Sequence, residues 1–200
     1  MTLVLASASP RRAELLRQID IPFTVVEPEI SEEISGPEKP ADLVVDLAQR
    51  KASAVTRRLE SGFVIGADTV VFFEGQSLGK PADEEDARRM LEMLSGKVHE
   101  VFSGLALFNA AGGNFETGLS KTKVWMKTLA KNNIDLYVKS GEPLDKAGAY
   151  GIQGRGAVFI DKIEGCYFNV VGLPLSLLFD LFIKMQVPTW LTRKDGGNGE

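Results

Sequence analysis

The sequence predicts an α/β protein built as one domain. Short apolar runs of strand length alternate with segments whose apolar residues recur at the period of an amphipathic helix. Of the 200 residues 44% are hydrophobic, enough for one sizeable core, and no long Pro-, Gly- or Ser-rich linker divides the chain. We expect a single domain over residues 1–188, and a disordered tail rich in glycine and charge over 189–200.

Charge and cysteine content argue against several classes of function. The chain has 23 basic and 27 acidic residues and a net charge of −4, which disfavours nucleic-acid binding and a polybasic membrane patch. Cys166, the single cysteine, excludes an intramolecular disulfide framework and a thiolate-rich zinc site. Because the chain also shows no signal peptide and no apolar stretch of the ~20 residues that span a membrane, we expect a cytoplasmic protein.

The N-terminal segment predicts a strand that leads into a helix. Residues 3–6 are apolar, and Ser9 followed by Pro10 is typical of a helix start, since the missing N–H of proline has no partner there. Arg11 and Arg12 lie in the first turn, where the helix dipole disfavours cations and favours anions. These arginines are either solvated or paired with an anion, either a phosphate or a carboxylate.

A second short strand is expected over residues 23–26, before an acidic, turn-rich segment (27–33) that we expect to be mostly solvated. A long helix then begins at Pro40, because apolar residues recur there with helical period. Lys51 lies beside this apolar stripe. Its spacing favours a buried aliphatic stem with the ammonium reaching solvent.

The most apolar run of the chain, residues 63–73, does not alternate and predicts a strand covered on both faces. Asp68 lies in its middle. A carboxylate in apolar surroundings is costly unless it is paired, metal-bound or protonated. A structural role in a turn or an ion pair is one explanation, but the neighbouring Gly66 and Ala67 favour a catalytic one.

Further elements follow in order. A turn delivers Lys80 in extended conformation before Pro81, and a helix with an acidic first turn runs from Asp83 to Gly96. Residues 98–108 and 115–127 predict a long hairpin. His99, the only histidine, is exposed by pattern, and we expect no functional role for it.

The C-terminal part contains a long glycine-punctuated loop. A helix capped by Thr128 is expected to reach about Lys139, with a strand over 157–163 and a closing helix from 172–174 to about Met185. The intervening loop over 141–156 is too long to be a simple connection, so we expect it to be functional. Its glycine spacing matches neither a Walker A loop nor a dinucleotide-binding loop.

Seven motifs in order resemble those of the Maf family of nucleoside triphosphate pyrophosphatases, over essentially residues 3–185. They are Ala6-Ser-Ala-Ser-Pro-Arg-Arg12, Leu47-Ala-Gln-Arg-Lys-Ala52, Gly66-Ala-Asp-Thr69, Gly79-Lys-Pro81, Leu94-Ser-Gly96, Asp145-Lys-Ala-Gly-Ala-Tyr-Gly-Ile-Gln-Gly154 and Val171-Gly-Leu-Pro174. The resemblance implies an elongated mixed sheet flanked by helices, with a deep central cleft like that of the inosine-triphosphate pyrophosphatases. It also implies hydrolysis between the α- and β-phosphates, a divalent metal (Mg²⁺ or Mn²⁺), and for many members a homodimer.

The same resemblance assigns roles to individual residues. Asp68 matches the catalytic acid that activates water, and it is also one of the two acids at the metal site. Glu32 matches the second acid at the metal site. Because Glu33 is its neighbour, either Glu32 or Glu33 could be this second acid. Four residues match phosphate-binding positions: Ser7, Arg12, Lys51 and Lys80.

Three positions resemble the subgroup that acts on dTTP, UTP and modified pyrimidine nucleotides: Arg11, Thr69 and Gln153. The amide of Gln153 offers a donor and an acceptor to the edge of uracil or thymine, whereas a carboxylate there suits a cationic methylguanine. Within the family, the alternative to a dTTP/UTP pyrophosphatase is a 7-methyl-GTP pyrophosphatase. A nucleotide-binding regulator of cell division is a separate alternative from a different functional class.

Overall fold

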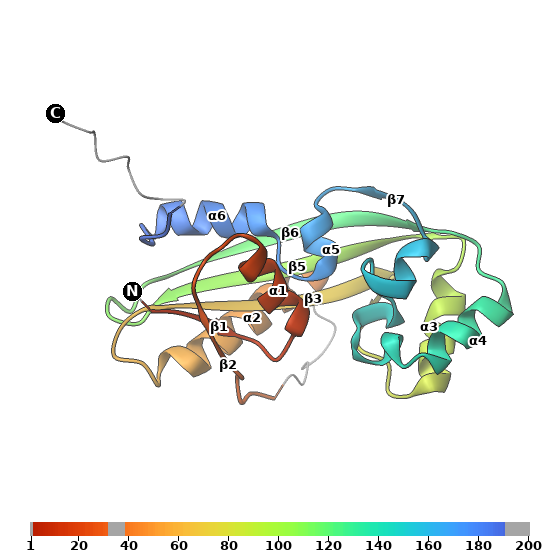
Figure 1. The fold of residues 1–200 in the computed structure, drawn as a ribbon, viewed down its shortest axis with the longest axis horizontal. Coiled ribbons are helices and arrows are strands. Elements are labelled where there is room, and N and C mark those ends of the chain that lie inside the picture. The colour runs from red at the N-terminus through yellow and green to blue at the C-terminus, as the bar shows by residue number, and fades with distance from the viewer. Residues whose placement is uncertain (1, 32–38, 191–200) are drawn as a thin grey trace.

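The computed structural model describes residues 2–31 and 39–190 and is built on one seven-stranded sheet (Figure 1). The strands are β1 Leu3–Ala6, β2 Thr24–Val26, β3 Phe63–Phe73, β4 Gln76–Leu78, β5 Val98–Asn109, β6 Phe115–Met126 and β7 Ile160–Glu164. Their order is β2-β1-β3-β5-β6-β7, with β4 paired to β3. β2, β1 and β3 are parallel and the other pairs antiparallel, so the predicted mixed α/β sheet is confirmed.

Six α-helices and three short 3₁₀ helices of the described residues accompany the sheet. The α-helices are α1 Pro10–Gln18, α2 Pro40–Thr56, α3 Glu84–Leu94, α4 Lys131–Lys139, α5 Tyr167–Val171 and α6 Leu175–Lys184, and the 3₁₀ helices are η1 Glu142–Asp145, η2 Ala147–Ala149 and η3 Gly154–Phe159. No helix in the described ranges has the length and apolarity needed to cross a membrane.

The helices cover both faces of the sheet. On one face α1, α5 and α6 pack on alternate residues of the central strands, such as Ile65 and Leu105. On the other face α2 packs on the intervening residues, such as Val64 and Ala106. α3 and α4 cover the far end of the long strands, where a third cluster includes Val71 and Leu91 (Figure 1). Both faces of β3 are covered, as its mostly apolar, non-alternating sequence predicts, and Asp68 and Thr69 are the polar exceptions in the strand.

Several boundaries differ from those predicted. Pro10 begins α1, but the Ser9 side chain caps nothing; its backbone N–H donates to Ser7 Oγ (3.1 Å) instead. α4 begins at Lys131 after Ala130, so the predicted cap at Thr128 is wrong. The 3₁₀ turns of η3 delay β7 to Ile160.

Two short elements, α5 and β4, were not predicted, because each is too brief to show a hydrophobic period. Glu32, Glu33 and residues 191–200 of the predicted tail lie outside the described residues.

Candidate active site

The site lies where one edge of β3 is open. β1 ends with Ala6 opposite Gly66, and β4 begins to pair with β3 at Val71. Between them, in the described part of the chain, residues 67–70 have a strand neighbour only on the β5 side. Side chains from both faces of the sheet therefore reach the space beside this edge, although successive strand residues point in opposite directions.

A cavity of about 520 Å³ occupies this position. Its wall is formed by the β1–α1 junction, α2, the middle of β3 and the segments 145–153 and 170–172. Eight of the predicted site residues line it: Ser7, Arg11, Arg12, Lys51, Asp68, Thr69, Lys80 and Gln153. The ninth, Glu32, lies outside the described residues.

Asp68 is paired with Lys51. Lys51 Nζ donates to Asp68 Oδ1 over 2.7 Å, and the two side chains are only 8% and 12% exposed. The prediction that the Lys51 ammonium reaches solvent is therefore wrong. Lys51 instead supplies the opposite charge that an acid in this apolar strand requires.

The close approach of α2 to the sheet makes this pair possible. A Cβ on Gly66 would lie 2.1 Å from the carbonyl oxygen of Ala48, and one on Gly104 would lie 2.2 Å from that of Val44. Two glycines, on adjacent strands, thus leave room for the helix backbone. Lys51, one turn further along α2, is brought against β3.

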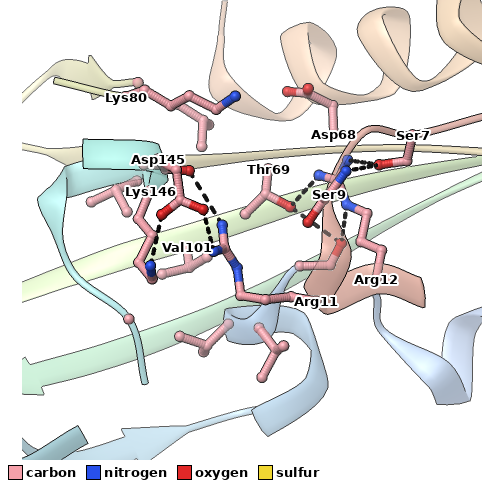
Figure 2. Close-up of a pocket in the computed structure, with 18 of the residues that line it drawn as sticks. Ser7, Ser9, Arg11, Arg12, Asp68, Thr69, Lys80, Val101, Asp145 and Lys146 are labelled. Atoms are coloured by element: carbon pink, nitrogen blue, oxygen red, sulfur yellow. Dashed lines mark hydrogen bonds and ion pairs between the residues drawn. The ribbon is translucent and has the colours of Figure 1, made fainter. Parts of the chain in front are cut away.

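Arg12 lines the cavity beside Ser7 and Thr69 (Figure 2). Its Nε donates to the Gly172 carbonyl (2.9 Å), Nη1 to Ser7 Oγ (3.2 Å) and Nη2 to Thr69 Oγ1 (3.3 Å). Thr69 in turn is bonded to buried Ser103 (2.8 Å). These contacts orient the guanidinium before any ligand arrives.

Arg11 extends toward the opposite wall, where Nη1 binds Asp145 Oδ2 over 2.8 Å (Figure 2). Of the two anions predicted for these arginines, Arg11 therefore meets a carboxylate. Lys146 Nζ also donates to Asp145, over 2.7 Å. Burial alone would raise the pKa of Asp145, but hydrogen bonds from Lys146 and Arg11 hold it below its ordinary value.

The cavity carries an excess of positive charge. Among the described lining residues five are cationic, Arg11, Arg12, Lys51, Lys80 and Lys146, and three are acidic, Glu27, Asp68 and Asp145. Lys80 is exposed and forms no ion pair with the described residues. Such a wall favours an anionic ligand.

Glu27 was not singled out from the sequence. It follows β2, which is parallel to β1, so both strands end at the same edge of the sheet. Ser7 and Glu27 consequently line the same cavity. The sequence does show an acid directly after a predicted strand. Only the strand order, which places β2 beside β1, shows that this acid reaches the cavity.

Tyr150 lines the cavity and is backed by His99, whose Nε2 lies 2.6 Å from the tyrosine hydroxyl. The prediction that His99 is exposed is wrong, since it is 2% exposed. Burial lowers the pKa of His99 to about 4 and raises that of Tyr150. Both rings are therefore neutral near pH 7.

Within the described ranges, no group of three or more His, Cys, Asp or Glu side chains could hold a metal ion. The carboxylates of Asp68 and Glu27 are the hard oxygen donors that Mg²⁺ prefers, and this ion keeps several of its waters when bound by one or two carboxylates. Both residues line the cavity, so the chemistry of these donors fits Mg²⁺.

The fold and the site define an α/β protein with a cationic cleft for a small anionic ligand. Residues 2–185 match the Maf family, described as Maf-like protein, and the chain belongs to that family.

Two curated relatives are each named dTTP/UTP pyrophosphatase. The protein of Carboxydothermus hydrogenoformans is 49% identical over 90% of this chain and 96% of its own. The protein of Pelotomaculum thermopropionicum is 49% identical over 91% of this chain and 95% of its own. Among solved structures, a nucleoside-triphosphatase/dITP/XTP pyrophosphatase of Mycobacterium abscessus aligns over 94% of this chain and 100% of its own, with 14% identity and a TM-score of 0.43.

Proposed function

We propose that this protein is a nucleoside triphosphate pyrophosphatase that hydrolyses dTTP and UTP to the monophosphate and pyrophosphate. The family membership and the names of the relatives support this activity. The observation that carries it is the buried Lys51–Asp68 pair at the wall of a cleft lined by five cations. An acid and a cation-rich surface in one cavity are the parts that phosphoanhydride hydrolysis needs.

In the proposed reaction Asp68 accepts a proton from a water molecule whose oxygen attacks the α-phosphorus. The bond between that phosphorus and the oxygen bridging to the β-phosphate breaks, and pyrophosphate leaves with the bonding electron pair. Arg12, Lys51 and Lys80 with the Ser7 hydroxyl hold the phosphates and offset their charge. Bound Mg²⁺ or Mn²⁺, held by Asp68 with Glu27 or Glu32, would supply further positive charge there.

Base selection is assigned to Gln153 and Thr69, with Arg11 acting through its ion pair with Asp145. The Gln153 amide matches the donor and acceptor edge of uracil and thymine. Exchanging Thr69 for Gln together with Gln153 for Glu is expected to shift preference toward 7-methyl-GTP. The homodimer and the cytoplasmic compartment stay predictions.

The test is release of pyrophosphate from dTTP and UTP with Mg²⁺ or Mn²⁺. Asp68→Asn should lower kcat by about 10²-fold or more, with an unchanged circular dichroism spectrum. Asp180→Asn, an equivalent change at an exposed position on α6, is the matched control. Release of single phosphates, or full activity of Asp68→Asn, would refute the proposal.

A further inference from the structure

The segment that carries Gln153 is short and has little regular structure of its own. Residues Gly151, Ile152 and Gln153 line the cavity, and Gln153 is in extended conformation just before η3. A side chain on such a segment reads a base reproducibly only if its backbone is held from behind. Contacts with two residues outside the cavity lining, Tyr137 and Glu142, supply that support.

Glu142 binds the chain just after Gln153. Its Oε2 accepts the backbone N–H of Arg155 over 3.0 Å, and its Oε1 accepts that of Gly156 over 3.1 Å. The hydroxyl of Tyr137 also donates to Oε1, over 3.1 Å. One carboxylate thus takes two main-chain donors and one side-chain donor.

Tyr137 binds the chain just before Gln153. While its proton points to Glu142, its oxygen accepts the backbone N–H of Gly151 over 3.2 Å. Together, Tyr137 and Glu142 therefore hold main-chain donors on both sides of Gln153. Tyr137 is itself fixed, as its ring meets that of Phe159 edge-on at 5.1 Å.

The fit between this pair and the segment leaves no room for further side chains. A Cβ on Gly156 would lie 2.6 Å from the Tyr137 hydroxyl oxygen. Gly154 has a φ of +66°, and a Cβ there would lie 3.0 Å from both carboxylate oxygens of Glu142. Gly154 and Gly156 thus face the two side chains directly.

We propose that Tyr137 and Glu142 are positioning residues that set base selectivity by holding the backbone on either side of Gln153. This inference rests on the proposed function. It adds two residues that touch neither the base nor the phosphates and whose role is to fix the residue that reads the base.

The charge states suit these roles. Burial alone would raise the pKa of Glu142, but the N–H groups of Arg155 and Gly156 and the Tyr137 hydroxyl lower it below its ordinary value. Burial and the neighbouring Glu142 charge raise the pKa of the Tyr137 phenol. At neutral pH the carboxylate accepts and the phenol keeps its proton.

Two nearly isosteric variants test the proposal. Glu142→Gln replaces one acceptor oxygen by an NH₂ group, which must face a backbone N–H or the tyrosine hydroxyl. Tyr137→Phe keeps the ring and removes the hydroxyl. Asp83→Asn is the matched control, because Asp83 also accepts a backbone N–H, from Asp86 over 2.8 Å, and does not line the cavity.

The readouts are kcat and KM for UTP and CTP with Mg²⁺, and competitive inhibition by inorganic tripolyphosphate, which has no base. In both variants we expect the ratio of kcat/KM for UTP to that for CTP to fall on the order of tenfold. The inhibition constant of tripolyphosphate should stay within about twofold, since the phosphate site is not touched. Asp83→Asn should keep the wild-type ratio. An unchanged ratio in both variants overturns the proposal.

A measurement on the wild-type protein does not depend on the variants folding. The amides of Gly151, Arg155 and Gly156 should exchange with solvent slowly, and Gln153→Ala should leave them slow. Rapid exchange of all three overturns the proposal even if the variants are unstable. Wild-type protein that releases no pyrophosphate from UTP refutes the proposed function instead, whatever the exchange rates are.

Discussion

At the scale of single residues, the site depends on side chains that are buried with one specific partner. Lys51 lies against Asp68 and His99 against Tyr150, and all four are buried. Buried polar groups are costly without a partner, so each such pair stabilises the fold only while both members are present.

Replacing Lys51 by Met should leave the Asp68 carboxylate buried without an opposite charge. The free energy of unfolding is expected to fall by about 3–5 kcal/mol, measured by urea denaturation at pH 7. The double variant Lys51→Met/Asp68→Leu should recover much of this loss, since an apolar pair of similar volume needs no counter-charge. If Lys51→Met alone were as stable as wild type, the buried Asp68 carboxylate would not need Lys51 as its counter-charge.

Acid should destabilise the protein through His99. Its pKa is about 4 in the folded protein against an ordinary 6.5, so the unfolded chain binds the proton first as the pH falls. The contribution of neutral His99 to the free energy of unfolding is present above pH 6.5 and is lost as the pH falls from 6.5 to 4. Between pH 7 and pH 5 the free energy of unfolding should fall by about 2 kcal/mol through this residue. Urea denaturation at both pH values should show this loss in wild type and not in His99→Gln. Equal losses in the two proteins would contradict it.

At the scale of elements, the packing of α2 on β3 and β5 brings Lys51 against Asp68. The helix lies close because Gly66 and Gly104 have no Cβ where its carbonyl groups pass. Lys51 is buried on this helix and Asp68 lies on the face of β3 that the helix covers. Any displacement of α2 should therefore affect both stability and catalysis.

Gly66→Ala is expected to force this displacement. The new Cβ would lie 2.1 Å from the Ala48 carbonyl oxygen, a backbone atom that no rotamer change can move. We expect a loss of about 3 kcal/mol in urea denaturation and a lower kcat. Gly79→Ala is the control for stability, because a Cβ there has no neighbour within 4 Å. Wild-type stability of Gly66→Ala would show that the close approach is not required.

At the scale of the whole molecule, the cavity joins parts of the chain that are far apart in sequence. Arg11 and Asp145, which form an ion pair in its wall, are separated by 134 positions. A ligand that contacts both walls should bind the folded chain and not the unfolded one. Ligand binding should therefore raise the melting temperature.

The test uses Asp68→Asn, which should bind UTP without consuming it. UTP with Mg²⁺ at 100 times its Kd should stabilise this variant by about 2.7 kcal/mol and raise Tm by roughly 5–10 °C in a fluorescence melt. Uridine at the same concentration should have little effect, because it lacks the phosphates that the proposed function places against the cations. An equal rise in Tm with uridine would show that the nucleoside, and not the phosphates, supplies the binding affinity.

Much of the fold was predictable because hydrophobic period is a local property. The long β3 strand, the α2 helix and the β5–β6 hairpin were all predicted from pattern and confirmed. The prediction of a helix cap at Thr128 was wrong, because α4 begins later, at Lys131. The prediction of an exposed His99 was also wrong, because His99 packs against Tyr150, which is remote in sequence.

The sequence by itself determined the order and type of the main elements, the apolar surroundings of Asp68 and the family. Only the tertiary structure decided that Asp68 and Thr69, neighbours on opposite faces of one strand, line the same cavity. The physical reason is the open edge of β3 between β1 and β4. Strand pairing is a relation between distant segments, so no local pattern of residues specifies where a sheet is left unpaired.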